Sequence, residues 1–336
     1  MPNTTLKQRL VRIDMMVGLA MTFVVLGHFS VGFEPKWYSL GLHNWIYSFH
    51  MEMFVFLSAF LIRYTYKGVD TLKDYGLYIW RKFKKFFIWF IVIGLAIALL
   101  ACPVKDIHLN GSYLLHSLRN LFLYPRWSEA SFLWYIYILF GYYLISPLFF
   151  RLPQWGQVAC CVGALFLAMV EGSVFLDTFD FCKYTFFYCL GVLCAQWIDD
   201  IRSVKVWQWG LMSVPFVAYS AWVFGKGQFI EFQFPQLGWW STVTGVSALP
   251  FFYLIAMALE KNKILKNIFT VISHDCYWIY LLQMFIIWGC ARVVHSAIHA
   301  GTISFTPFFI VTAILAIAMP ILLATLTKRF LNTNKR

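Results

Sequence analysis

Long apolar stretches separated by short polar connections run along the whole chain. A membrane-spanning helix rises 1.5 Å per residue and needs about 20 residues to cross the hydrocarbon layer. Ten stretches are apolar enough to do so, at residues 15–32, 45–62, 86–101, 132–150, 158–170, 184–198, 206–224, 239–259, 276–291 and 305–327. The pattern therefore predicts an all-α integral membrane protein, a bundle of about ten transmembrane helices that forms a single polytopic domain over residues 1–336.

Three of these stretches, at residues 158–170, 184–198 and 276–291, are short for a full crossing. Short helices often line a cavity inside a bundle. The first stretch is longer than the apolar core of a secretory signal and has no clear small-residue cleavage site after it, so we expect an uncleaved first helix.

Composition supports the membrane prediction. Hydrophobic residues make up 61% of the chain and charged residues 12%, and the mean hydropathy is +0.69. Soluble domains carry about 25% charged residues. A soluble fold could not cover this much apolar surface, so the composition excludes the soluble classes of protein.

The distribution of positive charge predicts the orientation. With the N-terminus inside, 20 of the 27 Lys and Arg residues fall on the inner side of the membrane. By the positive-inside rule, both termini are predicted to be cytoplasmic. The net charge of +12 is explained by this topology, and nucleic-acid binding is not needed to account for it.

Polar residues inside the predicted helices are candidates for function, because a polar side chain in a bilayer is costly. Asp14 begins the first helix, and His28 lies about 21 Å further along the axis. His50 and Glu52 lie at a similar depth in the second helix, so we expect His28 to approach His50 across a shared, outward-facing cavity. Glu52 is about 200° around the helix from His50 and is expected to face elsewhere.

A basic run precedes the third apolar stretch, with Arg81, Lys82, Lys84 and Lys85 in five positions. Two interpretations remain open. Positive residues flank most cytoplasmic helix ends, so the run can be a topology signal alone. The same residues can also bind phosphate groups of an anionic ligand at the inner mouth of the bundle.

The sequence predicts no metal site. His295 and His299 have the i, i+4 spacing of a metal-binding pair, but no third ligand is in sight. The eight cysteines contain no C-x-x-C pair, and we interpret them as small packing residues.

Several motifs occur in a characteristic order. The first helix reads RIDMMVGLA and then VVLGH over Arg12–His28, and the second ends FHMEMFVFLSAFL over Phe49–Leu61. The basic run follows, and later come FLWY at residues 132–135, ISPL at 145–148 and ISHDCYWIYLL at 272–282. Together these motifs resemble the membrane acyltransferase 3 family over most of the chain.

The resemblance implies a protein that moves an acyl group, often acetyl, from cytoplasmic acyl-coenzyme A (acetyl-CoA) as co-substrate to a sugar hydroxyl of a surface polysaccharide or lipid-linked carbohydrate. It implies a multi-pass protein of the bacterial cytoplasmic (inner) membrane, with acyl-CoA, a carbohydrate acceptor and membrane lipids as partners and a homo-oligomer left open. The positions that match the family's functional residues are Asp14, His28, His50, Arg81 and Lys84, with Lys85 beside them.

The chain departs from the family pattern at four places. Val17 stands where the family commonly has Arg or Lys, Glu52 where it has proline, Ala59 where it has glycine, and Gln283 where it has histidine. The missing charge at position 17 could weaken a cofactor contact, and Glu52 adds an ionisable group.

These residues suggest a mechanism for acyl transfer. A sugar hydroxyl is a poor nucleophile at neutral pH and needs a base, and histidine titrates in the right range. His28 would deprotonate the hydroxyl or carry the acyl group briefly, and His50 would assist. The cluster of Arg81, Lys84 and Lys85 would hold the coenzyme A phosphates. Trp134 and Tyr135 would line a sugar subsite, or anchor the helix at the membrane interface.

Two other functions fit the same residues. A transporter or flippase for a lipid-linked sugar or small acid would use intramembrane His and Glu side chains as coupling or substrate sites. A b-type haem protein would use His28 and His50 as axial ligands.

Overall fold

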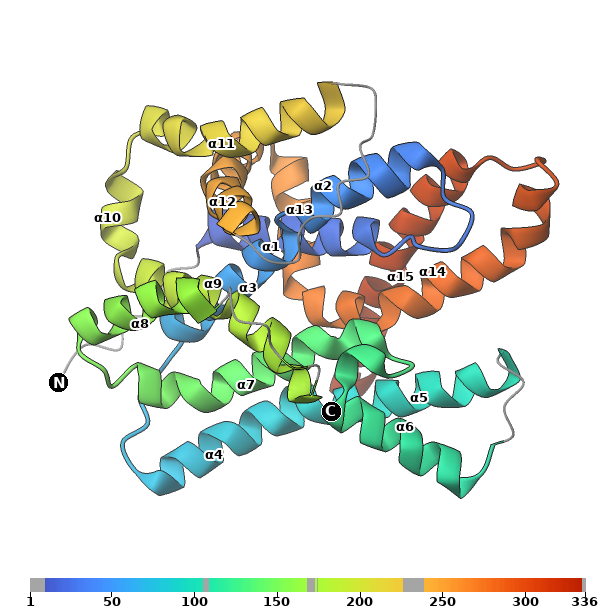
Figure 1. Ribbon diagram of the computed structural model, residues 1–336, viewed down its shortest axis with the longest axis horizontal. Coiled ribbons are helices and arrows are strands. Elements are labelled where there is room, and N and C mark those ends of the chain that lie inside the picture. Colours follow the sequence, from blue (N-terminus) through green and yellow to red (C-terminus); the bar gives the residue numbers. More distant parts are fainter. Residues whose placement is uncertain (1–9, 105–108, 168–172, 174, 226–238, 334–336) are drawn as a thin grey trace. The chain divides into compact units, whose positions relative to one another are not determined.

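The computed structural model describes residues 10–104, 109–167, 173, 175–225 and 239–333 (Figure 1). Within these residues every regular element is a helix, and helices account for 86% of the structure. The prediction of an all-α fold is therefore confirmed. Residues cluster into two compact units, Met1–Phe54 with Val204–Arg336, and Val55–Ser203. The single polytopic domain stays a prediction.

The first unit holds both ends of the described chain. Its α-helices pack in pairs, α1 on α13, α11 on α12 and α14 on α15, and the last pair runs side by side in Figure 1. The elements are α1 (Val11–Gly27), a π-helical segment (Trp37–Leu42), α2 (His43–Tyr47), the first turn of α3 (His50–Tyr64), α11 (Val206–Gly225), α12 (Trp239–Leu259), α13 (Lys263–His274), α14 (Cys276–His299) and α15 (Phe305–Thr333).

The second unit is built along one long helix. It begins as α4, passes through a π-helical turn and continues as α5, with α6 packed on α5 and α7 packed on α4 (Figure 1). The elements are the rest of α3, α4 (Leu72–Lys82), the π-helical turn (Phe83–Phe87), α5 (Ile88–Val104), α6 (Gly111–Leu123), α7 (Trp134–Phe149), α8 (Gln154–Leu167), α9 (Thr178–Gln196) and α10 (Ile198–Ser203), with short 3₁₀ turns at Pro125–Trp127, Ser131–Leu133 and Phe175–Asp177.

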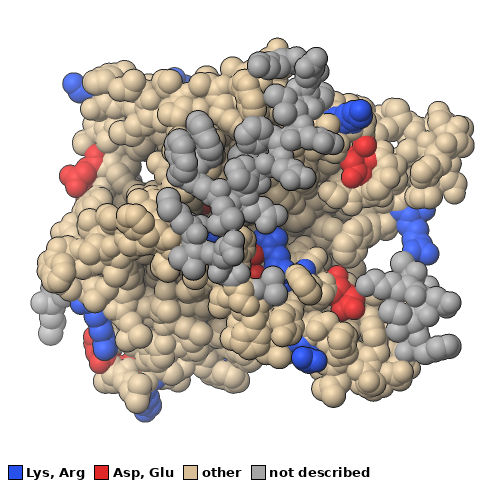
Figure 2. Space-filling view, viewed as in Figure 1, with Lys and Arg blue, Asp and Glu red and all other residues tan. Residues whose placement is uncertain are grey.

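The described residues of each of the ten predicted stretches lie mostly or wholly on helices. Among the described residues, six helical stretches are long and apolar enough to cross a membrane, at Trp37–Tyr64, Leu72–Cys102, Ser131–Phe149, Ser241–Leu259, Cys276–His299 and Phe305–Arg329. The others lie on α1, α8, α9 and α11. The chain is thus a multi-pass membrane protein, and the face in Figure 2 carries few, scattered charges. The count of ten and the cytoplasmic termini stay predictions, since residues 1–9, 168–170 and 334–336 lie outside the described residues.

An aromatic cluster forms the centre of the first unit. The Phe23 ring meets Phe49 and Phe252 edge-on, with ring centroids 5.2 Å apart in both pairs. Phe49 also stacks on Phe252, and Phe216 closes the cluster at 5.1 Å from Phe49. Because such pairs prefer fixed geometries, the cluster positions α1, α11 and α12 against the residues just before α3.

Close packing of α1 on α13 depends on a glycine. A Cβ atom added at Gly18 would overlap the main-chain carbonyl of Phe269, which cannot move without moving α13. We expect Gly18→Ala to destabilise the protein by about 1–3 kcal/mol, because overpacking forces main-chain shifts.

Thermal unfolding in detergent measures this effect. The matched control is Gly163→Ala on α8, where an added Cβ meets nothing within 4 Å. This control should be neutral or stabilising by up to about 1 kcal/mol, since alanine is the better helix former. Equal stabilities of the two variants would contradict the close approach of α1 and α13.

Candidate active site

The helix that carries His50 is broken immediately before that residue. α2 ends at Tyr47, α3 begins at His50, and the two residues between them form a turn. A helix break inside a membrane frees main-chain groups, and these must be satisfied within the protein. The Thr244 hydroxyl donates to the Ser48 carbonyl (3.0 Å), and His50 Nδ1 donates to the Ile46 carbonyl (2.8 Å). The imidazole of His50, only 2% exposed, is therefore one of the groups that satisfy the main chain at the break.

Three aromatic rings form a ladder along this broken helix. His43 stacks on Tyr47 with ring centroids 4.1 Å apart, and Tyr47 meets His50 at 4.6 Å. Tyr47 also lies close to α1, because a Cβ at Gly27 would be 3.1 Å from its ring. The ladder thus extends from His50 to the end of α1, where His28 follows Gly27.

His28 lies at the C-terminal end of α1. The residue keeps some exposure, but its Nδ1 is buried and forms no hydrogen bond of good geometry within the described part of the chain. His43 lies within electrostatic range of the ring, and Gln283 on α14 lies near enough for a hydrogen bond. Nevertheless, neither atom of the Gln283 amide forms a hydrogen bond of acceptable geometry, although the residue is 0% exposed. A buried polar atom without a hydrogen bond costs about 1–3 kcal/mol of stability. A group that formed hydrogen bonds with the side chains of His28 and Gln283 would therefore stabilise this cluster.

The two acidic candidates also belong to the first unit. Asp14 lies in the first turn of α1, where a carboxylate is stabilised by the helix dipole. Glu52 lies in the first turn of α3 and is buried. Beside Asp14, the Arg12 guanidinium pairs with the Glu260 carboxylate at 2.7 Å and connects α1 to the end of α12. The roles of Asp14 and Glu52 stay predictions.

The basic run lies where the long helix of the second unit changes its geometry. Arg81 lies in the last turn of α4, while Lys84 and Lys85 lie in the π-helical turn. Such turns are frequent at functional sites, because the wider turn rotates the following side chains. All three side chains are exposed, and within the described part of the chain none of them pairs with a carboxylate. Three uncompensated cations are thus available to an anionic ligand.

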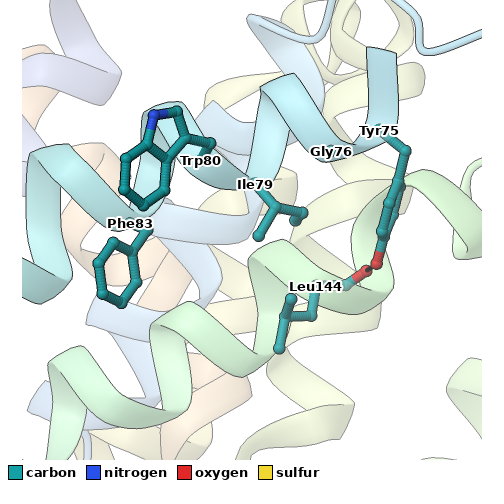
Figure 3. Close-up of a pocket in the computed structure, with 6 residues that line it drawn as sticks. All are labelled: Tyr75, Gly76, Ile79, Trp80, Phe83 and Leu144. Atoms are coloured by element: carbon teal, nitrogen blue, oxygen red, sulfur yellow. Dashed lines mark hydrogen bonds between the residues drawn. The ribbon is translucent and has the colours of Figure 1, made fainter. Parts of the chain in front are cut away.

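A pocket of about 330 Å³ is lined by residues of α4, the π-helical turn and α7 (Figure 3). Trp80 and Phe83 stack in parallel along one side, with ring centroids 5.6 Å apart, and the Lys84 ammonium group lies 5.5 Å from the Trp80 ring. At the other end, the Tyr75 hydroxyl donates to the Leu144 carbonyl at 2.8 Å. The pocket therefore combines an aromatic wall with a positive charge at its edge.

Trp134 and Tyr135, the predicted sugar-binding residues, begin α7 and are both buried. The guanidinium of Arg126 lies 4.1 Å from the Trp134 ring, and Tyr184 stacks on the same ring. The Tyr135 hydroxyl is 2.5 Å from that of Ser58. Both side chains are thus engaged with protein groups, and their contact with a sugar stays a prediction.

The Arg126 guanidinium forms a two-pronged ion pair in the second unit. Its Nε and Nη2 donate to the two carboxylate oxygens of Asp180 at 2.5 and 2.7 Å. Asp177 is buried beside this pair, and burial together with repulsion from Asp180 raises its pKa. Leu176 and Asp177 both have positive φ angles, which are rare for residues other than glycine. No pattern along the chain indicated this cluster, because Arg126 and Asp180 are 54 positions apart.

The structure arranges the predicted residues in two groups. The first unit holds His28, His50, Asp14 and Glu52, and the second unit holds Arg81, Lys84, Lys85, Trp134 and Tyr135.

Sequence reasoning missed His43 and Tyr47, which connect His50 to the surroundings of His28. The spacing offered a signal. His43 lies four residues before Tyr47 and seven residues before His50, and both spacings place side chains on one face of a helix.

The rings of His295 and His299 lie 4.4 Å apart on α14. Within the described residues, however, His, Cys, Asp and Glu nowhere gather in a group of three or more that could hold a metal ion.

Comparison with known proteins gives one result. A family model described as acyltransferase domain matches residues 10–325, nearly the whole chain. No curated protein and no solved structure matches.

Proposed function

Because the chain belongs to the membrane acyltransferase 3 family, we propose that it transfers an acyl group, in the first instance acetyl, from cytoplasmic acyl-CoA to a hydroxyl of a cell-surface or lipid-linked carbohydrate. Membership of the family indicates acyl transfer to a carbohydrate or a similar acceptor. The donor, the acceptor and the setting in a bacterial cytoplasmic membrane are the further content of the proposal.

The observation that carries the proposal is the state of His28. This histidine matches the family's first-helix histidine, and its buried Nδ1 forms no hydrogen bond of good geometry with the described residues. A neutral imidazole nitrogen with a lone pair is the group that removes a proton from an alcohol near neutral pH. His28 is therefore suited to act as the general base.

The reaction needs one proton to move twice. The acceptor oxygen attacks the thioester carbonyl, a carbon–oxygen bond forms, and the hydroxyl proton passes to His28. The carbon–sulfur bond then breaks, and His28 returns the proton to the leaving thiolate, so that the ester and free coenzyme A are the products. In the alternative route His28 accepts the acyl group first and passes it to the hydroxyl.

The basic run supports coenzyme A as the donor. Coenzyme A carries three phosphate groups and an adenine base. The exposed cations Arg81, Lys84 and Lys85 match the phosphates, and the Trp80 and Phe83 wall offers an aromatic surface for a flat base. On this proposal the anionic part of the donor stays on the cytoplasmic side of the membrane.

Charge reversal at the basic run tests this assignment. We expect the pair Arg81→Glu and Lys84→Glu to raise KM for acetyl-CoA by about tenfold or more, because it turns attraction for the phosphates into repulsion. The effect should be larger at low salt, where charges are screened least. The matched control is Lys73→Glu, an exposed lysine two turns earlier on α4. An unchanged KM at low salt would remove the run from donor binding.

Transfer of labelled acetyl from acetyl-CoA to glycans by the purified protein tests the function as a whole, together with mass spectrometry of surface glycans from cells with and without the gene. A transporter or flippase would move substrate into proteoliposomes and form no acetylated product. A haem protein would show a Soret band in its absorption spectrum. Either result without acetyl transfer would contradict the proposal.

A further inference from the structure

Three buried polar atoms at the end of α1 and on α14 form no hydrogen bond of good geometry with the described residues. They are Nδ1 of His28 and the two side-chain atoms of Gln283, Nε2 and Oε1. Buried polar groups in folded proteins are nearly always satisfied, so a group of three such atoms is exceptional. Unsatisfied atoms at one place indicate a position that a ligand completes.

The hydrogen-bonding chemistry of the three atoms specifies the ligand. A glutamine amide donates through its nitrogen and accepts through its oxygen, and a neutral imidazole nitrogen accepts. A hydroxyl group both donates and accepts. One hydroxyl can donate to His28 Nδ1 while it accepts from Gln283 Nε2, and a second hydroxyl on the next carbon can donate to Gln283 Oε1. A vicinal diol, the common feature of sugars, therefore has the donors and the acceptor that the three atoms require.

We propose that Gln283 binds the acceptor carbohydrate through a vicinal diol and presents one of its two hydroxyls to Nδ1 of His28. This inference rests on the proposed acyl transfer and adds to it the residue that selects and orients the acceptor. Gln283 holds the reacting oxygen while His28 takes its proton, and the neighbouring hydroxyl fixes which of the two oxygens is acylated.

The proposal predicts how acceptors are distinguished. Removing the neighbouring hydroxyl leaves Gln283 Oε1 unsatisfied in the complex. A site built to bind a hydroxyl discriminates strongly against an analogue that lacks it. We expect kcat/KM to fall by about 100-fold or more between a diol acceptor and its monodeoxy analogue.

Gln283→Leu removes the amide and keeps a side chain of similar size. Its first expected effect is functional: kcat/KM for the diol acceptor falls to nearly that of the deoxy analogue, and the ratio between the two approaches one. Its second effect is on stability. Since the lost amide atoms form no hydrogen bond of good geometry with the described residues, the melting temperature should stay the same or rise.

The matched control is another buried glutamine, Gln157, whose amide is fully engaged. Its Nε2 donates to the Leu152 carbonyl at 2.9 Å, and its Oε1 accepts from Gln196 at 2.5 Å. Gln157→Leu should lower the melting temperature and leave the acceptor ratio unchanged, the reverse of the result at Gln283.

The experiment uses the purified full chain, labelled acetyl-CoA, and methyl glycosides with vicinal diols together with their 2-deoxy and 3-deoxy analogues. If wild-type protein acetylates a diol acceptor and Gln283→Leu keeps the same ratio, the inference is overturned and the proposed function stands. A lower melting temperature of Gln283→Leu with an unchanged ratio would show that the amide holds a structural water, and this also overturns it. If wild-type protein acetylates none of the acceptors, the proposed function fails, and the inference fails with it.

Discussion

Alanine in place of His28 is expected to lower kcat for acyl transfer by about 100- to 10,000-fold, the usual contribution of a general base. The imidazole supplies the proton acceptor without which almost none of the acceptor hydroxyl is reactive. Nδ1 forms no hydrogen bond of good geometry with the residues that the structure describes, so the fold should survive the change. Initial rates with labelled acetyl-CoA measure the effect, and the melting temperature of the variant reports the fold.

The matched control for this variant is His116→Ala, which removes an exposed imidazole from α6. It should transfer acetyl at the wild-type rate. Rapid quenching followed by mass spectrometry separates the two routes, since only an acyl carrier would leave an acetyl group on His28. Transfer by His28→Ala at the wild-type rate would remove His28 from the mechanism.

Removal of the Arg126 guanidinium is expected to cause the largest loss of stability, about 3 kcal/mol for Arg126→Ala. The Asp180 carboxylate is 2% exposed and accepts two hydrogen bonds from Arg126. Without them its charge stays buried next to Asp177, and a buried charge without a partner is strongly unfavourable. Denaturant unfolding in detergent measures the change.

An exposed ion pair in the same unit provides the control. Arg202 and Asp199 are 3.4 Å apart on α10, with 43% and 90% of their side chains exposed. Pairs of this kind contribute about 0–1 kcal/mol, so Arg202→Ala should have little effect. The Arg126 side chain is itself 40% exposed, and the expected loss therefore depends on the burial of Asp180. A loss no larger than that of Arg202→Ala would show that water reaches the Asp180 carboxylate.

Hydropathy predicted the positions of the helices because each apolar stretch must hide its main chain from lipid, and a helix does this locally. It did not predict the break before His50. Two groups compensate for the break. One is the Thr244 hydroxyl, 196 positions away from Ser48, and the other is the imidazole of His50, which the sequence suggested only as a catalytic group. A break is stable only in the presence of these partners, and pairings over such distances leave no pattern along the chain.

The same limit applies to the candidate site. His28, His50 and the basic run stand out in the sequence because polar side chains are unusual in apolar stretches. Tyr47 does not stand out, since tyrosine is ordinary at a membrane interface. Gln283 was noticed only as a departure from the family pattern, and its burial beside His28 without a hydrogen bond is a property of the fold.

The bond between His50 and the Ile46 carbonyl determines the tautomer of the imidazole. A carbonyl oxygen only accepts, so the proton of neutral His50 resides on Nδ1, and Nε2 carries the lone pair. A proton can then enter and leave through Nε2 alone while the helix break remains closed. An asparagine that reached the same carbonyl would keep the break closed, but it has no ring nitrogen at which a proton could be exchanged.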